Sequence, residues 1–480
     1  MKKTLLFTFA IFYSLNLMAQ MAPGWEVYHS GYTEESRGIS RFGILNDTSA
    51  DVAWSVAYDG SGNGADISAI AYTNDGGLTW TAYDPVQLPG VVNLGISMVF
   101  PSDANTAYVA GYKRSFGNGG VWKTTDAGAS WNKVTTSNMY SNSASFCNII
   151  YFVDQNNGFV QGDPINGEFE MYYTTDAGAT WTPIAGSDIA DPLAGEYGYT
   201  GGVVGVGSTI WFTTNKGRLY KSTDGGLTWP NAYQTPLTDF GGAADNGSVT
   251  FKDVNEGWIL RGNGELYHTT DGGVTWTLMT TTGLNNYGGE ITFVPGQTDM
   301  LVAVDADATN NHAGAAVSRD GGATWERIIY YNFDGGPWEV LDVANGGQIQ
   351  HTSVAFRDID FGLSGGFSHL NDPNDPDSPS SQGVFKYVDE AVDTGSIANQ
   401  TIEGLSVYPN PATNTVNFKS ENAPIANIAI FDITGKEVIK MNDLSLNNTS
   451  IDVSNLQRGI YLVKIEDENG AKQAVKLVLQ

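Results

Sequence analysis

Acidic and aromatic side chains gather in four long stretches of this 480-residue chain, at 163–170, 183–200, 330–350 and 369–382. Two carboxylic acids held about 5 to 9.5 Å apart, one protonated and one ionised, can hydrolyse a glycosidic bond. Aromatic rings beside carboxylates can instead bind a sugar or a peptide without reacting with it. These stretches and the residue that follows the third one supply the candidates: Asp163, Glu168, Asp188, Asp191, Glu196, Tyr197, Tyr199, Asp334, Trp338, Glu339, His351 and His369.

Binding and hydrolysis both remain open at this point, because chain order does not show whether two of the carboxylates converge. We therefore predict ligand binding, keep a glycoside hydrolase as the alternative, and assign no catalytic residue. The residues that we predict to bind ligand are Asp163, Glu168, Glu196, Tyr197, Tyr199, Trp338, Glu339 and His351.

Composition argues against metal and nucleic-acid chemistry. Cys147 is the only cysteine and the five histidines lie at least 18 residues apart, so no zinc motif is present. With 52 acidic and 24 basic residues, the formal charge of -28 repels phosphate backbones and anionic lipid. The oxygen-rich run 372–377 could hold Ca²⁺, but its prolines fit a disordered insertion equally well. Calcium is thus the one ion considered, and no other cofactor is expected.

A second set of acidic and aromatic residues recurs at a regular interval. The phrase Thr73-Asn74-Asp75-Gly76-Gly77-Leu78-Thr79-Trp80 has five similar successors, with tryptophans separated by 51, 50, 48, 47 and 49 residues. Its aspartate can accept backbone N–H groups across a tight turn, its second glycine can adopt a positive φ, and its tryptophan can bury a large ring. We call these phrases the Asp turns and predict a structural role for Asp75 and Trp80, Asp126 and Trp131, Asp176 and Trp181, Asp224 and Trp229, Asp271 and Trp276, and Asp320 and Trp325.

Strand-like runs flank the Asp turns in a fixed order. One repeat has an apolar run at 149–154, a glycine-led run at 158–161, a run entering the turn at 171–173, and a strand after the tryptophan. Four antiparallel strands every 40 to 50 residues are typical of β-propeller blades. The sequence therefore predicts an all-β protein whose residues 20–390 form a propeller.

The two ends of the predicted propeller fit together. Residues 383–389 resemble 120–126 but lack an Asp turn, and 24–27 resemble 324–327 without one. An N-terminal strand that completes the last blade would leave no open sheet edge. We therefore predict seven blades, with six as the alternative.

Blade geometry places the candidate residues. If the first strand of each blade is innermost, the Asp turns join the third and fourth strands on one face of the ring. The four acidic and aromatic stretches then lie on the opposite face, around the central channel, where long loops on a rigid scaffold bind ligands. We expect the ligand there.

The Asp turns resemble the Asp box, or bacterial neuraminidase repeat, of sialidases, sortilin-type receptors and xyloglucan-hydrolysing propellers. The stretch from 162–164 through 195–196 to 223–225 also resembles propellers related to the photosystem II assembly factor. The resemblance implies a fold and no single activity. Sialidases surround the substrate carboxylate with three arginines, and the first of these arginines lies in the motif Phe/Tyr-Arg-Ile-Pro. Arg41-Phe42-Gly43-Ile44 departs from that phrase, so a sialidase-like activity is only part of the hydrolase alternative.

The first residues predict export. Lys2 and Lys3 precede an apolar run from Leu5 to Leu17, and a small residue stands at Ala19. This pattern is typical of a signal peptide, here residues 1–19, and the run is shorter than the about 20 residues of a membrane span. We expect no membrane span in the rest of the chain, which would be delivered by way of the periplasm.

The last 76 residues differ in charge from the rest, with 8 acids and 7 bases against 44 and 15 in residues 20–404. Their short alternating runs predict a β-sandwich of about seven strands at 405–480, after a linker at 391–404. Tyr408-Pro409-Asn410-Pro411, the turn 432–436, 456–462 and 475–477 resemble the type A C-terminal sorting domain of the type IX secretion system. The resemblance implies that an outer-membrane translocon reads this domain and that the protein is secreted or attached to the cell surface.

Overall fold

The protein is described by a computed structural model in which the placed residues are 24–34, 37–61, 67–90, 94–113, 119–243, 245–285, 287–306, 313–332, 339–340, 350–368, 382–388, 402, 404–431, 437–441, 444–468 and 472–479. The predicted signal peptide, nearly all of the predicted linker and the calcium candidate at 372–377 lie outside these residues. The chain divides into two compact units, described separately below: Ala22–Phe333 with Glu339–Glu390, and a unit that contains Ala391–Gln480.

Antiparallel strands in the first unit pair in groups of four, and within most groups neighbouring strands are also consecutive in the chain. Among the described residues, six groups are continuous in sequence: β2 (Arg37–Ile44), β3 (Ala53–Asp59), β4 (Ile70–Thr73) and β5 (Thr81–Tyr83); β6 (Gly95–Pro101), β7 (Ala107–Tyr112), β8 (Gly120–Thr124) and β9 (Asn132–Lys133); β10 (Cys147–Phe152), β11 (Gly158–Ile165), β12 (Glu168–Thr174) and β13 (Thr182–Pro183); β14 (Gly198–Val206), β15 (Thr209–Thr214), β16 (Arg218–Ser222) and β17 (Asn231–Gln234); β19 (Asp245–Phe251), β20 (Gly257–Arg261), β21 (Leu266–Thr269) and β22 (Thr277–Leu278); β23 (Glu290–Phe293), β24 (Leu301–Asp305), β25 (Gly314–Ser318) and β26 (Glu326–Arg327). A 3₁₀ turn at Gly186–Asp188 and the two-residue strand β18 (Gly241–Gly242) lie in the connections.

A further group joins the two ends of the propeller sequence. It consists of β29 (Ser353–Asp358), β30 (Phe361–Ser368), β31 (Gln382–Val388) and, outermost, β1 (Gly24–His29). Strand β1 runs antiparallel to β31, with Gly24 opposite Val388 and His29 opposite Gly383. The predicted pairing of the N-terminal strand with this segment is confirmed. On its other side β1 pairs with β27 (Ile329–Asn332), which pairs with β28 (Glu339–Val340).

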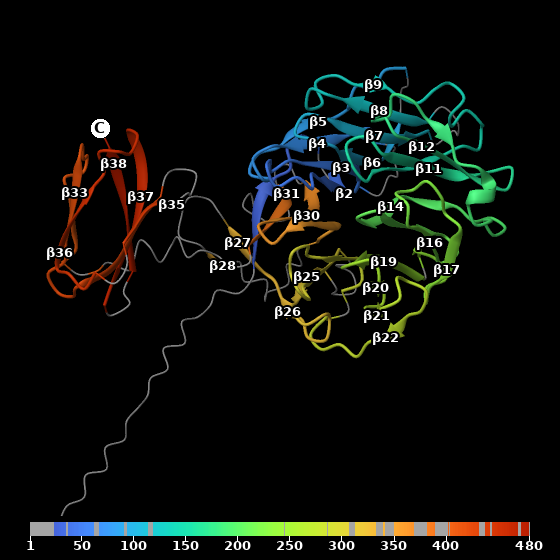
Figure 1. Ribbon diagram of the computed structural model, residues 1–480. Coiled ribbons are helices and arrows are strands. Elements are labelled where there is room, and N and C mark those ends of the chain that lie inside the picture. The colour runs from blue at the N-terminus through green and yellow to red at the C-terminus, as the bar shows by residue number, and fades with distance from the viewer. Residues whose placement is uncertain are drawn as a thin grey trace, which may run out of the picture. The chain divides into compact units, whose positions relative to one another are not determined.

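The groups stand around a ring (Figure 1). Their first strands touch one another in chain order, β2, β6, β10, β14, β19, β23 and β29, and β29 returns to contact β2. The all-β propeller prediction is confirmed. We number the seven four-stranded groups of the described residues as blades one to seven, in the order of these first strands, and the count of seven blades stays a prediction.

The Asp turns share one hydrogen-bond pattern. In the first, Asp75 Oδ1 accepts from the Thr73 hydroxyl at 2.8 Å and the Thr79 amide at 3.0 Å, and Oδ2 accepts from the Thr79 hydroxyl at 2.6 Å. The same three bonds recur in the other five turns. These carboxylates are occupied by their own turns, as a structural role requires.

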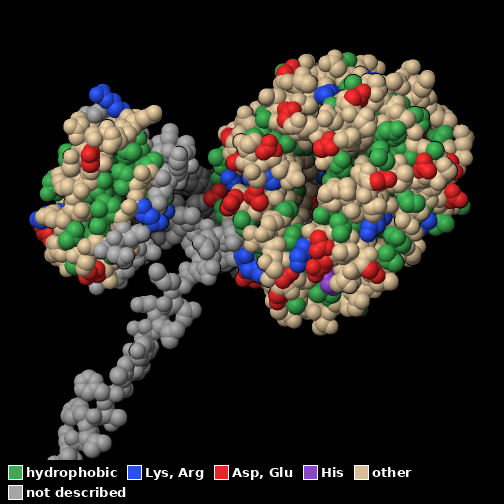
Figure 2. All heavy atoms as spheres, viewed as in Figure 1, with side chains coloured by type: hydrophobic (Ala, Val, Ile, Leu, Met, Phe, Trp, Pro, Cys, Tyr) green, Lys and Arg blue, Asp and Glu red, His purple; other side chains and the backbone are tan. Residues whose placement is uncertain are grey.

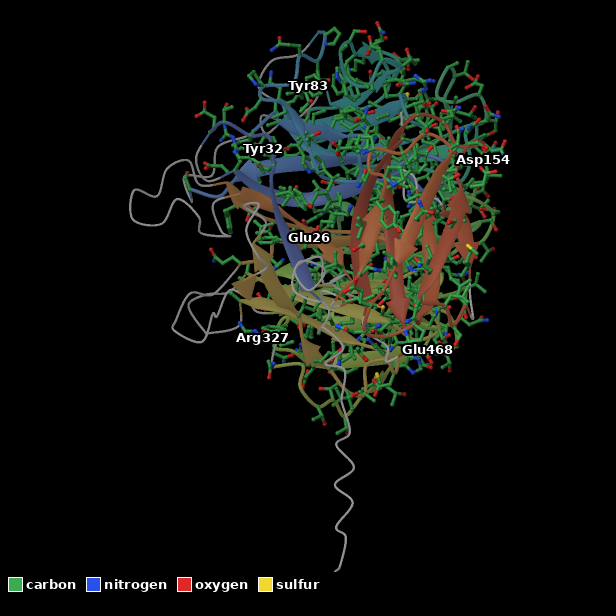
Figure 3. All side chains as sticks on the ribbon, turned by 90° about the vertical axis from the view of Figure 1, so that its left-hand side faces the viewer. Glu26, Tyr32, Tyr83, Asp154, Arg327 and Glu468 are labelled. Atoms are coloured by element: carbon green, nitrogen blue, oxygen red, sulfur yellow. The ribbon has the colours of Figure 1, made fainter. Side chains whose placement is uncertain are left out.

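Each Asp turn also ties its blade to neighbouring structure. The amide of its fourth residue donates to the hairpin between the first and second strands of the same blade, as in Ala177 to the Asn156 carbonyl at 2.9 Å. In several Asp turns, the carbonyl of this fourth residue accepts a hydrogen bond from an aromatic side chain of the preceding blade. Tyr83, labelled in Figure 3, donates to Ala127 at 2.9 Å, and Trp211 donates to Gly272 at 3.0 Å. The turns thereby hold adjacent sheets together on one face of the ring.

The second unit is a two-sheet sandwich. One sheet contains β32 (Ser406–Tyr408), β33 (Thr415–Lys419) and β36 (Asn448–Asp452), and the other contains β35 (Glu437–Met441), β34 (Ile425–Phe431), β37 (Gly459–Asp467) and β38 (Lys472–Leu479). Both sheets contribute to one apolar core, which includes Val416, Phe418, Ile428 and Val463. The turn predicted at 432–436 lies outside the described residues.

Candidate functional site

A polar cavity of about 330 Å³ lies in the central channel. Its lining comes from the first strands of several blades and the residues next to them: Ser40, Arg41, Tyr199, Thr200, Gly201, Gly202, Val203, Thr213, Phe240, Gly241, Gly247, Ser248, Val249, Gly289, Glu290 and Thr352. Most of these residues lie near the beginnings of their strands. Asp turns dock instead on the hairpins that follow the ends of the same strands, as in the bond from the Gly272 amide to the Asn255 carbonyl. The cavity therefore belongs to the end of the channel opposite the Asp turns.

Arg41 crosses this channel. Its Nη1 and Nη2 donate to the carbonyls of Gly201 and Thr200, each at 2.6 Å, so that a side chain of the first blade holds the backbone of the fourth. Both strands are irregular where they meet: the register shifts between Ile39 and Arg41 in β2, and between Gly198 and Val203 in β14. A β-bulge bends a strand and redirects its side chains, which explains how β14 reaches the guanidinium.

Gly201 is required for this approach. Its φ of +56° lies in the left-handed region, and a Cβ at this position would collide with the Arg41 guanidinium. A glycine therefore satisfies two demands at once, the backbone conformation and the space for the arginine.

Two half-buried side chains of the cavity, Arg41 and Glu290, each affect the pKa of the other. Burial lowers the pKa of Arg41, an effect that the nearby Glu290 carboxylate opposes. Burial raises the pKa of Glu290 to about 7, against the lowering effects of Arg41 and of the Val354 amide, which donates to it at 2.8 Å. Glu290 can therefore gain or lose a proton near neutral pH. Neither residue was among the predicted site residues: Arg41 stands in a phrase that departs from the sialidase motif, and Glu290 only precedes a predicted strand.

Three of the predicted residues come together beside this cavity. Tyr199 lines it and donates its hydroxyl to Asp239. Tyr197 is 41% exposed, and its ring centroid lies 5.6 Å from that of Tyr199, edge to face. The Asp163 carboxylate accepts hydrogen bonds from Asn148 Nδ2 at 2.7 Å and from the backbone amide of Gly198. Burial raises the pKa of Asp163 to about 6, although these hydrogen bonds lower it.

Two predicted residues have contacts of a structural kind. Glu196 is buried and accepts from Arg218 Nε at 3.0 Å and from the Thr214 hydroxyl at 2.7 Å. His351 is 1% exposed, its Nδ1 lies 2.6 Å from the Ser364 hydroxyl, and burial lowers its pKa to about 3, so the ring is neutral. Neither side chain is available to a ligand in the channel, and we leave both out of the proposed site.

The remaining predicted residues lie elsewhere or are not placed. Glu168 begins β12 and packs against Gly186, and its Oε2 is a buried oxygen that has no hydrogen-bond partner among the residues that the structure describes. Trp338 lies outside the described residues, and Glu339 is described only as the first residue of β28. Whether these two contribute to the site stays a prediction.

Fold and cavity together define a β-propeller with a polar cup at one end of its channel. The second unit has a clear relative: residues 406–480 match the secretion system C-terminal sorting domain family. The chain is thus a type IX passenger, secreted or attached to the outer-membrane surface. Among the described residues, no helix is long and apolar enough to cross a membrane.

Solved propellers resemble the chain at low identity. YCF48 from Cyanidioschyzon merolae has a TM-score of 0.48 at 15% identity and covers 76% of this chain and 98% of its own. A YCF48 bound to D1 peptide has 0.44 at 14%, covering 76% and 99%. The GH74 xyloglucanase of Xanthomonas campestris has 0.46 at 14%, covering 83% and 59%. No curated protein matches the chain. At these similarities none of the structures bears on the ligand of this protein.

Proposed function

We propose that this protein is an extracellular recognition protein whose propeller binds a glycan or a protein through the face opposite the Asp turns. The observation that carries the proposal is the cup built around Arg41. There, a fixed guanidinium, a titratable carboxyl group and an aromatic ring line one cavity.

The chemistry of the cup suits a ligand rich in hydrogen-bonding groups. Ser40, Ser248 and Thr352 add hydroxyls to the lining, and its glycines leave backbone groups accessible. Convergent polar groups on a rigid scaffold are typical of binding sites. Tyr197, exposed beside Tyr199, adds an aromatic surface at the rim on which a sugar ring or a side chain can pack.

Binding is favoured over hydrolysis by the number of carboxylates. Among the described residues that line the cup, Glu290 alone carries a carboxyl group. A glycosidase needs a second one about 5 to 9.5 Å away. Hydrolysis remains the second candidate because burial raises the pKa of both Glu290 and Asp163, which lies beside the cup, as general acids require.

The domain assignment completes the proposal. Residues 1–19 direct the chain across the inner membrane, 20–390 form the binding propeller, 391–404 link it to the tail, and 405–480 are read by the translocon. Acidic side chains are spread over the visible propeller surface in Figure 2, as suits a protein kept soluble outside the cell.

The proposal is tested by screening the mature chain against glycans and extracellular proteins and comparing variants on every ligand found. Tyr197→Ala, at an exposed rim position, should weaken binding about tenfold, as expected for loss of a contact aromatic. Leu227→Ala, an equally exposed change on an Asp turn, is the matched control and should bind as wild type. Equal affinity of all three proteins would refute the assignment of the face. Sugar release that is lost in both Glu290→Gln and Asp163→Asn would instead establish the hydrolase.

A further inference from the structure

A second and larger cavity lies at the other end of the central channel. Its volume is about 700 Å³, and it shares no lining residue with the cup. Its wall is formed where the first strands of the blades end, for example at Ile44, Pro101 and Phe152, and by the hairpins that follow. The Asp turns dock on the same hairpins, as at Asn156, so this cavity opens on the face where the sequence predicted no ligand.

An aromatic wall with one uncommitted hydroxyl marks the cavity. Phe100 and Tyr151 are half-buried, and their ring centroids lie 5.2 Å apart at 62°. The Tyr151 hydroxyl lies over Gly205, where a Cβ would collide with it, and it has no hydrogen-bond partner among the described residues. Burial raises the pKa of Tyr151 to about 12, so at neutral pH the phenol is both a donor and an acceptor.

The charged side chains that line this cavity are all engaged with other groups. Four lining residues carry a charge, two cations and two anions, and hydrogen bonds or ion pairs of 2.7 to 3.0 Å hold each of them: Lys252 with Glu256 and Asp299, Arg357 with Asp51 and Asp358, Asp47 with the Ser49 amide, and Asp154 with the amides of Asn156 and Asn157. An anionic ligand would therefore find no unpaired cation, and the Asp47 and Asp154 carboxylates, which accept hydrogen bonds from neutral groups only, would repel it. Apart from these two carboxylates, the polar groups left over are neutral.

We propose that this cavity is a second binding site and that its ligand is a neutral oligosaccharide. One sugar ring packs against Phe100 and Tyr151, and a sugar hydroxyl bonds to the Tyr151 phenol. Asn46 and Gln155, exposed in the lining, supply further neutral donors and acceptors. The volume is within the range of about 300–1,000 Å³ typical of small-ligand pockets. The site is separate from the cup, so it does not depend on the function proposed above.

Titration calorimetry on the full mature chain tests the proposal. The probes are cello-, malto-, manno- and laminari-oligosaccharides of about three to six units, with oligogalacturonides of equal length as the charged comparison. At least one neutral series should bind, and Tyr151→Phe, which keeps the ring, should weaken it about 3- to 10-fold, the value of one hydrogen bond. Tyr173→Phe, a half-buried tyrosine outside both cavities, is the matched control and should change nothing.

A second variant and a thermal-unfolding measurement distinguish loss of binding from loss of folding. Gly205→Ala should displace the Tyr151 hydroxyl and weaken the same neutral series, while the thermal midpoint of Tyr151→Phe stays at the wild-type value. The proposal is overturned if no neutral series binds, if oligogalacturonides bind equally well, or if binding is untouched by both Tyr151→Phe and Gly205→Ala. Capture of a protein that Tyr151→Phe releases, with no oligosaccharide bound, would also overturn it and assign the cavity to a protein ligand.

Discussion

At the scale of single residues, the cup depends on one contact that spans the ring. Arg41 fixes the backbone of β14 at Thr200 and Gly201, and this backbone carries Tyr199 into the cavity. A guanidinium suits this role because its planar fork donates to two carbonyls at once. Sequence reasoning named Tyr197, Tyr199 and Asp163 as candidates by residue type, and their role in binding stays a prediction. It did not find Arg41 or Glu290, because they lie on β2 and β23, far apart in the chain, and no local pattern predicts that these two side chains meet.

Gly201→Ala should separate the contact from the rest of the fold. The added Cβ occupies the place of the guanidinium and also strains a backbone held at φ +56°. Left-handed backbone costs a non-glycine residue about 1–2 kcal/mol, and loss of the Arg41 bonds adds to this. Urea denaturation should show a loss of about 2–3 kcal/mol in the free energy of unfolding. Gly207→Ala, also at positive φ but with no neighbour within 4 Å, is the control for backbone strain alone, and an equal loss in both variants would contradict the account.

The carboxylates of the Asp turns make stability depend on pH. Burial raises the pKa of Asp224, but hydrogen bonds from Thr228 and Ser222 outweigh it and lower the pKa below its usual value. The charged form is therefore favoured by folding, so its contribution is complete above the unfolded-state pKa of about 4 and is lost as pH falls through the folded-state value.

Asp224→Asn should accordingly lower the free energy of unfolding by about 1 kcal/mol at pH 7. The loss is smaller than for buried hydrogen bonds to a charged group, because this side chain is exposed to solvent. Thermal unfolding from pH 7 to pH 3 should show the difference from wild type shrinking below pH 4. Asp188→Asn, exposed in the 3₁₀ turn, is the control for the loss of one charge. A difference that stays constant with pH would refute the assignment.

At the scale of elements, the Asp turn was the most predictable part of the molecule. Its spacing identified the hairpin between the third and fourth strands, and the predicted positive φ of Gly77 is found at 88°. The residue before it was not foreseen: it is also left-handed, and two turns place Ala127 and Ala177 there at φ 54° and 57°. An alanine gives no sequence signal for that conformation, since few alanines adopt it.

Ala177→Gly should therefore stabilise the protein. Glycine removes the steric cost of the left-handed backbone, and its greater freedom in the unfolded chain offsets part of the gain, leaving up to about 1 kcal/mol. Ala179→Gly, two residues further in the same turn and without a positive φ, should instead destabilise by about 0.5–1 kcal/mol. Chemical denaturation should show changes of opposite sign in the free energy of unfolding of the two variants. A decrease in both variants would show that Ala177 is not strained.

At the scale of the whole molecule, a closed ring explains how a chain whose described residues contain no α-helix holds its strands in a rigid arrangement. Each blade is a four-stranded sheet, too small to be stable by itself, and it buries its faces against two neighbours. The ends of the ring meet in one sheet, because β1 completes the group begun by β29. The sequence predicted this from the missing Asp turn after 383–389. It could not predict the two cavities, because their walls combine residues far apart in the chain.

Ring closure is also the condition on which both proposed binding sites depend, since each cavity is lined by residues from both ends of the propeller sequence. Glu26 and Lys386 are direct partners across β1 and β31, and Glu26 is labelled in Figure 3. Directly opposed positions on neighbouring antiparallel strands lie within the Cα separation that a disulfide needs. The chain's own cysteine, Cys147, is buried and does not compete.

The most direct measurement is therefore thiol counting and thermal unfolding of the Glu26→Cys, Lys386→Cys double variant after oxidation. The account predicts that both new thiols disappear, that mass spectrometry links the two peptides, and that the midpoint rises reversibly with oxidation, since the bond closes a very long loop. A Glu26→Cys, Lys123→Cys variant should keep its thiols. If the first pair stays reduced in a folded protein, or if the control pair crosslinks as readily as the first, the N-terminal strand does not close the ring, and the architecture described for both proposed sites is wrong.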